Sequence, residues 1–143
     1  MLYLAQNPDK QSKMQEELDS ILGNGNDPLT PDQMAKLSYT KAAVKETLRM
    51  SPVSLGVARS LRNDVVLSGY RIPKGFNVFA LTKYAGMMEE FFPEPNEFLP
   101  ERWIREHASG SLKPYSCVPF GFGPRMCIGR RFAEQEMYVI LAR

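Results

Sequence analysis

Near its C-terminal end the chain reads Phe120-Gly121-Phe122-Gly123-Pro124-Arg125-Met126-Cys127-Ile128-Gly129-Arg130-Arg131-Phe132-Ala133. The glycines and the proline disfavour a regular helix or a central strand, so this stretch is predicted to be a loop as far as Gly129. Beyond it, apolar residues recur at helical spacing, as Phe132, Ala133, Met137, Ile140 and Leu141. Cys127 is therefore expected at a junction between a loop and a helix.

The predicted position of Cys127 favours thiolate chemistry. The free N–H groups and positive dipole end of a helix stabilise a thiolate, and Arg125 and Arg130 add positive charge on either side. A thiolate can act as a nucleophile or as a metal ligand. A nucleophile usually needs a base, and the only histidine is His107, whereas zinc needs several ligands and Cys117 is the only other cysteine. A single thiolate is sufficient on one face of a haem iron.

The composition is that of a globular protein. The 143 residues are 43% hydrophobic and 24% charged, and 18 basic against 16 acidic residues give a net charge of +2. This charge gives no reason to expect nucleic-acid binding. The sequence has no apolar run of transmembrane length and no signal or transit peptide at Met1. Two cysteines without scaffold-like spacing indicate a reducing compartment or one in which disulfides are not used.

The periodicity and turn signals predict a mainly α-helical chain with a small β-sheet. Asn7-Pro8 is expected to open a helix that stops at Gly23. Thr30 to Gln33 has the form of a capping box, and a break is expected near Ser38. The predicted segments are the helical region 31–50, short strands within 53–82 (57–61, 65–67 and 76–81), an ordered coil at 83–118, the cysteine loop at 119–129 and the start of a last helix at 130–143.

The cysteine loop resembles the haem-binding loop of the cytochrome P-450 family. The family pattern Phe-x-x-Gly-x-Arg-x-Cys-x-Gly is matched at each fixed position, and Ala133 matches a further preferred position. The resemblance implies a haem b cofactor with Cys127 as the iron ligand. The residues implied at the cofactor are Phe120, Gly121, Arg125, Ile128, Gly129 and Ala133. The alternative is a buried structural cysteine in a glycine-rich loop.

A second motif, Glu46-x-x-Arg49, places two opposite charges on one face of the predicted helix. By itself such a pair is usually solvated and contributes little to the stability of the fold. In its context it resembles the Glu-x-x-Arg helix of the same family, and the segment from Phe98 to Trp103 resembles the downstream arginine motif. The resemblance implies a structural cluster of Glu46, Arg49 and Arg102 that holds the coil against the haem-side core.

Other residues correspond by position to functional residues of the family. Arg59 lies where relatives place an arginine near a haem propionate, as does Arg125, and the fork geometry of a guanidinium matches a carboxylate. The alternative for Arg59 is a solvated arginine on a strand. Residues 53–57 resemble a segment that touches substrate in relatives, although valine and leucine there also suit a plain core.

Basic residues at two places resemble the mitochondrial branch of the family. They are Lys41 and Lys45 on the predicted helix, and Arg130 and Arg131 after the cysteine loop. The resemblance implies a ferredoxin-type electron donor, with a flavoprotein reductase as the alternative. It also implies a membrane-associated parent protein on the matrix side of the mitochondrial inner membrane, or else at the endoplasmic reticulum. A solvated basic face is the simpler interpretation.

The resemblance covers essentially the whole chain and implies the C-terminal part of the cytochrome P-450 fold, incomplete on its own. The oxygen-activating central helix is expected before Met1, so the chain alone is expected to be inactive. The implied parent is a monooxygenase that inserts one oxygen atom from O2 into an apolar substrate such as a sterol, a lipid or a xenobiotic. The alternatives are a haem-thiolate isomerase or dehydratase, and a truncated product without haem.

Overall fold

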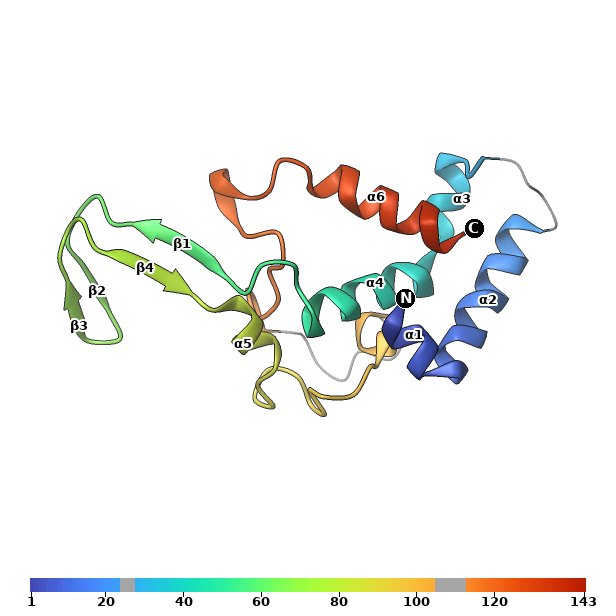
Figure 1. Ribbon diagram of the computed structural model, residues 1–143, viewed down its shortest axis with the longest axis horizontal. Coiled ribbons are helices and arrows are strands. Elements are labelled where there is room, and N and C mark those ends of the chain that lie inside the picture. Colours follow the sequence, from blue (N-terminus) through green and yellow to red (C-terminus); the bar gives the residue numbers. More distant parts are fainter. Residues whose placement is uncertain (24–27, 105–112) are drawn as a thin grey trace.

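The computed structural model describes residues 1–23, 28–104 and 113–143, with helices around a central helix and a narrow β-arm to one side (Figure 1). In chain order the elements are α1 (Leu2–Gln6), α2 (Pro8–Leu22), α3 (Pro31–Lys36), α4 (Ser38–Met50), β1 (Val57–Ser60), β2 (Val65–Leu67), β3 (Tyr70–Ile72), β4 (Asn77–Ala80), α5 (Thr82–Gly86), η1 (Pro100–Trp103), η2 (Gly123–Arg125) and α6 (Arg130–Leu141). The predicted fold class, mainly α with a small β part, is confirmed. Within the described residues the β part consists of two antiparallel pairs rather than one sheet.

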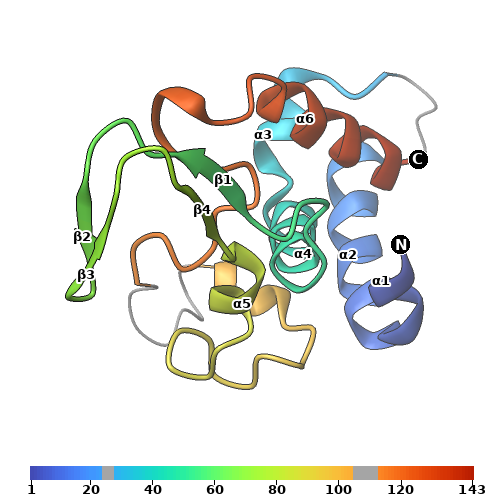
Figure 2. The same cartoon turned by 60° about the vertical axis from the view of Figure 1, so that its left-hand side comes forward.

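Helix α4 is the centre of the fold. It contacts α2, α5, α6 and η1, and the second view shows α2, α5 and α6 around it (Figure 2). Burial of each large apolar side chain here contributes about 1.5–3 kcal/mol. The buried core cluster consists of Leu4, Met14, Leu18, Leu37, Tyr39, Ala43, Met50 and Phe98. None of the described helices combines the length and apolarity needed to cross a membrane.

The N-terminus of α4 is capped by a residue from another helix. Glu17 of α2 accepts hydrogen bonds from the backbone N–H groups of Tyr39 at 2.6 Å and Thr40 at 2.8 Å, and from the Thr40 hydroxyl at 2.8 Å. A carboxylate is favourable at this position because it satisfies free N–H donors and faces the positive end of the helix dipole. This contact joins α2 to α4.

The predicted helix boundaries are largely confirmed. The capping box at Thr30 is present, and α3 ends at Lys36 before α4 begins at Ser38, so the predicted break is real. Pro8 occupies the first turn of α2, but the Asn7 side chain does not cap it. Instead its amide donates to the Tyr3 carbonyl at 2.8 Å. The reason is that α1 ends at Gln6, directly before Asn7, and leaves carbonyl groups that need donors.

The β-arm, residues 57–80, is a long hairpin that begins and ends beside the helices (Figure 1). Strand β1 pairs with β4 in the register Arg59 with Val78, and β2 pairs with β3 further out. The sequence prediction missed β3. At the base of the arm, a Cβ on Gly56 would lie 2.1 Å from the Ala80 carbonyl oxygen, so only glycine fits there.

The segment predicted as coil, 83–118, contains short helical turns within its described part. Helix α5 begins at Thr82, and η1 forms one 3-10 turn at Pro100–Trp103. Residues 105–112, with the predicted polar segment around His107, lie outside the described residues. Between these turns, backbone carbonyls of Pro95 and Glu97 accept hydrogen bonds from the Arg49 side chain of α4.

Candidate functional site

The cysteine loop, residues 119–129, folds back on itself. The Cys127 N–H donates to the Phe120 carbonyl at 2.9 Å, and the Gly121 N–H donates to the Val118 carbonyl at 2.9 Å. Gly121 and Gly123 have φ values of 74° and 75°, a left-handed conformation that glycine adopts without strain. These turns, with η2 between them, bring the residues of the sequence motif into one loop.

Cys127 lies directly before the last helix, as the sequence predicts. Helix α6 begins at Arg130, with Gly129 as its N-cap, and the Arg130 N–H donates to the Cys127 carbonyl at 3.3 Å. The Cys127 side chain is exposed. The loop therefore presents an accessible thiol at the N-terminal end of a helix of 12 residues.

Large apolar side chains around Cys127 are also exposed. Ile128 is fully exposed, and Phe122 and Phe132 have exposed fractions of 66% and 71%. Exposed apolar side chains of this size suit contact with another apolar body. Among the described residues no group of three or more His, Cys, Asp or Glu side chains could hold a metal ion. A single exposed cysteine with exposed apolar side chains beside it in the chain fits haem, whose iron needs one protein ligand on this face.

The arginines predicted at the cofactor are solvent-accessible. Arg125 ends η2 in the cysteine loop, and Arg59 lies on β1 with its guanidinium donating to the Ala58 carbonyl at 2.7 Å. A Cβ on Gly121 would lie 3.6 Å from Val57, so the loop packs beside the start of β1. Within the described part of the chain neither guanidinium forms an ion pair with a carboxylate, and both remain available to an added one.

The structure brings Glu46, Arg49 and Arg102 together. Arg49 binds Glu46 through two bonds, Nη2 to Oε1 at 2.8 Å and Nε to Oε2 at 3.0 Å, and both side chains are completely buried. Arg102 adds a bond from Nε to Oε1 at 2.9 Å. Two guanidinium groups on one carboxylate satisfy the requirement that a buried charge be paired and hydrogen-bonded.

Arg49 and Arg102 also fix the path of the backbone before η1, at residues 86–97. Arg49 donates to the carbonyls of Gly86 at 2.7 Å, Pro95 at 2.8 Å and Glu97 at 3.2 Å. Arg102 donates to two further carbonyls in the same segment, at residues 93 and 94. Backbone that lacks regular secondary structure thus finds its hydrogen-bond donors in side chains. The cluster ties this segment to the central helix.

Trp103 is a member of this cluster to which the sequence analysis assigned no role. Its indole N–H donates to Glu46 Oε2 at 2.8 Å, and its ring lies 6.0 Å from that of Phe92. The signal that could have identified it is its place directly after Arg102 in a chain with one tryptophan. A buried indole N–H usually requires a partner.

The four predicted docking residues lie on α4 and at the start of α6, and they differ in their contacts. Lys45 is exposed, and its ammonium lies 5.9 Å from the centre of the Trp103 ring. Lys41 is half-buried and donates to the Ala35 carbonyl at 2.8 Å. Arg130 pairs with Glu134 at 2.9 Å, whereas Arg131 is exposed. Lys45 and Arg130 face a common space.

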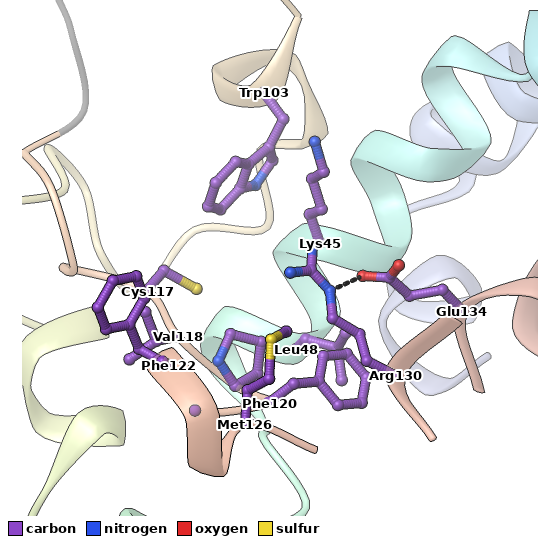
Figure 3. Close-up of a pocket in the computed structure, with 13 residues that line it drawn as sticks. Lys45, Leu48, Trp103, Cys117, Val118, Phe120, Phe122, Met126, Arg130 and Glu134 are labelled. Atoms are coloured by element: carbon purple, nitrogen blue, oxygen red, sulfur yellow. Dashed lines mark hydrogen bonds and ion pairs between the residues drawn. The ribbon is translucent and has the colours of Figure 1, made fainter. Parts of the chain in front are cut away.

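A cavity of about 500 Å³ lies between α4, η1, the cysteine loop and the start of α6, and we call it the α4–α6 cavity (Figure 3). Lys45, Trp103, Phe120 and Arg130 are among its walls. Cys117 also lines it, and burial raises the pKa of this thiol to about 11. Cys117 is therefore a neutral thiol at physiological pH.

The comparisons with known proteins agree with the geometry of the loop. The family model described as cytochrome P-450 matches residues 1–143. The chain is 44% identical over 146 residues to the probable mitochondrial cytochrome P-450 12d1 proximal of Drosophila melanogaster, covering 100% of this chain and 28% of that protein. It is 40% identical to the mitochondrial cytochrome P-450 302a1 of the same species and 39% identical to the cytochrome CYP12A2 of Musca domestica. Each of these matches covers 100% of this chain and 29% of the relative.

The chain thus spans less than a third of the length of these curated relatives. Within that span, the match includes the thiol-bearing loop, the Glu46 cluster and the β-arm together. The chain belongs to the cytochrome P-450 family.

Proposed function

We propose that residues 1–143 form the haem-binding part of a haem-thiolate monooxygenase, with Cys127 as the ligand of the haem b iron. The observation that carries this proposal is the exposed Cys127 thiol, held by the cysteine loop at the start of α6 and surrounded by exposed apolar side chains. When bound, thiolate-ligated haem supplies the oxygen chemistry by which one atom of O2 enters an apolar substrate. The chain's own contribution is to hold and orient that group.

Individual residues take distinct roles in this proposal. The hydrogen bond from the Cys127 N–H to the Phe120 carbonyl holds the backbone of Cys127 in place within the loop. Gly121 adopts the left-handed backbone conformation of the loop beside β1, and Ile128 supplies apolar contact surface. Gly129 and Ala133 form the first turn of α6, where the Ala133 N–H donates to the Gly129 carbonyl at 2.9 Å. Small residues there leave room for a planar cofactor.

The two accessible arginines suit the acidic edge of the cofactor. Arg59 and Arg125 have no carboxylate partner among the described residues and could each bind one haem propionate. A guanidinium–carboxylate pair with two parallel hydrogen bonds is stronger than a neutral hydrogen bond. We expect this pairing to orient the haem, while the thiolate sets its distance from the loop.

For electron supply we propose a small acidic iron–sulfur ferredoxin that docks at Lys45, Arg130 and Arg131, with Lys41 nearby on the same helix. Exposed positive side chains steer an acidic partner towards a protein of low net charge. Two of the relatives named above are described as mitochondrial. We therefore propose a mitochondrial location for the parent, on the matrix side of the inner membrane, and an apolar substrate.

The primary experiment is the reduced carbon-monoxide difference spectrum of the haem-loaded protein that contains residues 1–143, hereafter the holoprotein. We expect a thiolate-type band in the wild type and in Cys117→Ser. Cys117 is a neutral thiol that lines the α4–α6 cavity, and Cys127 does not line that cavity. Cys127→Ser should lose the band. A thiolate-type band that survives in Cys127→Ser and disappears in Cys117→Ser would contradict the assignment.

The docking proposal is tested separately by electron transfer from a ferredoxin. Combined replacement of Lys41 and Lys45 with glutamate should slow the transfer, with the largest effect at low salt because charge steering is screened by salt. Combined replacement of Arg62 and Lys74 with glutamate, which makes the same charge change on the exposed β-arm, is the control. An unchanged rate at low salt, or faster reduction by a flavoprotein reductase, would contradict a ferredoxin at this face.

A further inference from the structure

The α4–α6 cavity has no role in the function proposed above, apart from its position on the face where the donor would dock. Its volume of about 500 Å³ lies in the range of small-molecule sites, which are mostly apolar with a few polar groups. Helix α4, η1, the cysteine loop and α6 each contribute a wall. Its apolar walls include Leu48, Trp103, Val118 and Phe120.

The charged side chains of this cavity leave one uncompensated positive charge. Lys45, Arg130 and Glu134 line it. Glu134 pairs with Arg130 at 2.9 Å, so these two largely cancel. Lys45 forms no ion pair within the described residues, and its ammonium faces only the ring of Trp103, 5.9 Å from the ring centre. The charge of the cavity therefore matches a ligand with a single negative charge.

The residues that line the rest of the cavity are uncharged. Figure 3 shows the Cys117 sulfur directed towards the same space as Lys45 and Trp103. Burial raises the pKa of this thiol, so it adds no negative charge that would repel an anion. The indole of Trp103 is fixed by its bond to Glu46 and presents a rigid aromatic surface. An aromatic ring that packs on this surface gains contact without having to order a flexible wall.

From this arrangement we propose that the α4–α6 cavity binds an aromatic monocarboxylate. Its carboxylate pairs with the Lys45 ammonium and reaches the free N–H groups of Arg130, while its ring packs between Trp103 and Phe120. The four groups come from four separate elements, so the site exists only in the folded protein.

The site has a regulatory consequence, and this part rests on the proposed function. Lys45 and Arg130 are two of the residues to which we assign donor docking. An acid bound between them neutralises the steering charge and covers the approach to α4. Occupation of the cavity should therefore compete with the ferredoxin and slow electron transfer without changing the haem ligand.

The test is calorimetric titration of the holoprotein with 2-naphthoate, compared between the wild type and three variants. Lys45→Gln removes the uncompensated charge, and Cys117→Phe fills the cavity from the apolar wall. Lys41→Gln is the matched control, because Lys41 lies one turn away on α4 and does not line the cavity. Each variant is first checked for its thiolate-type carbon-monoxide band, so that a loss of binding is not a loss of fold.

We expect affinity to fall by about tenfold or more in Lys45→Gln, since a hydrogen bond to a charged group is lost, and binding to disappear in Cys117→Phe. Affinity should be unchanged in Lys41→Gln. No binding to the wild type, or binding that is equal in all four proteins, would overturn the site. Binding with this pattern but without competition against ferredoxin would support the site and contradict the proposed docking face instead.

Discussion

Trp103 and Glu46, 57 residues apart in the chain, are joined by a hydrogen bond of 2.8 Å between the indole N–H and the carboxylate. This bond completes the set of donors around one buried carboxylate. The other donors are Nε and Nη2 of Arg49, Nε of Arg102 and the backbone N–H of Leu99 at 3.1 Å. These donors satisfy the hydrogen-bonding capacity of a carboxylate that no solvent reaches. Trp103 therefore belongs to the structural cluster as much as the arginines do.

We predict that Trp103→Phe lowers the free energy of unfolding of the holoprotein by about 1.5–3 kcal/mol. The substitution keeps an aromatic ring and removes the donor to a buried charged acceptor. Urea unfolding, followed by the loss of the haem spectrum, measures the change. Lys45→Gln, which removes only the cation over the ring, should cost less than about 1 kcal/mol. Equal effects of the two substitutions would mean that the indole N–H contributes nothing.

Removal of Glu46 should have a larger effect. Glu46→Ala leaves the buried guanidinium of Arg49 and the partly buried one of Arg102 without their carboxylate. Breaking a buried ion pair in this way lowers the free energy of unfolding by about 3–5 kcal/mol. We expect little or no folded, haem-loaded protein, measured as haem content per purified chain. Glu97→Ala is the control, because only the backbone carbonyl of Glu97 contacts the cluster. Normal haem content in Glu46→Ala would refute this role.

Glu17 is predicted to stabilise the protein through the N-terminus of α4. Glu17→Ala removes the acceptor for two backbone N–H groups and the Thr40 hydroxyl, and should lower stability by about 1–2 kcal/mol. Glu16→Ala, at the exposed neighbouring position, should change it little. The comparison of urea midpoints for these two adjacent residues isolates the cap. If both variants unfold at the wild-type midpoint, the interhelix cap has no energetic role.

The acid stability of the protein should depend on Glu101. Burial pushes its pKa upward, but hydrogen bonds from Lys13 and Lys10 outweigh burial and hold the pKa at about 2, below the usual 4.5. Because the folded-state pKa is the lower one, the charged form stabilises the protein above about pH 4.5, and this stabilisation disappears as pH falls towards 2.

In Glu101→Gln, the loss of stability between about pH 5 and pH 2 should therefore be less steep than in the wild type. Urea midpoints measured at several pH values in this window give the slope. Glu89→Gln, at an exposed carboxylate without an ion pair within the described part of the chain, is the control. A Glu101→Gln protein that keeps the wild-type slope would show that another group governs the acid transition.

Features that depend on neighbouring residues could be predicted from the sequence. The capping box at Thr30 and the first-turn proline of α2 act within one helical turn, so their residue types are sufficient. The position of Cys127 between a loop and a helix could also be predicted, because glycines define the loop and apolar spacing defines the helix within a short stretch. The family of the chain, the fold class and the candidate ligand all rest on such local patterns.

Other features could not be predicted, because their partners are distant in the chain. The three hydrogen bonds made by Glu17 reach Tyr39 and Thr40 across a loop, and the bond from Trp103 reaches Glu46 only after the intervening segment has folded. Strand β3 has three residues and is stabilised by pairing with β2 rather than by its own propensity. The set of residues that line the α4–α6 cavity also depends on tertiary packing. Local propensity does not determine how α4, η1, the cysteine loop and α6 pack together, whereas burial and hydrogen bonding do.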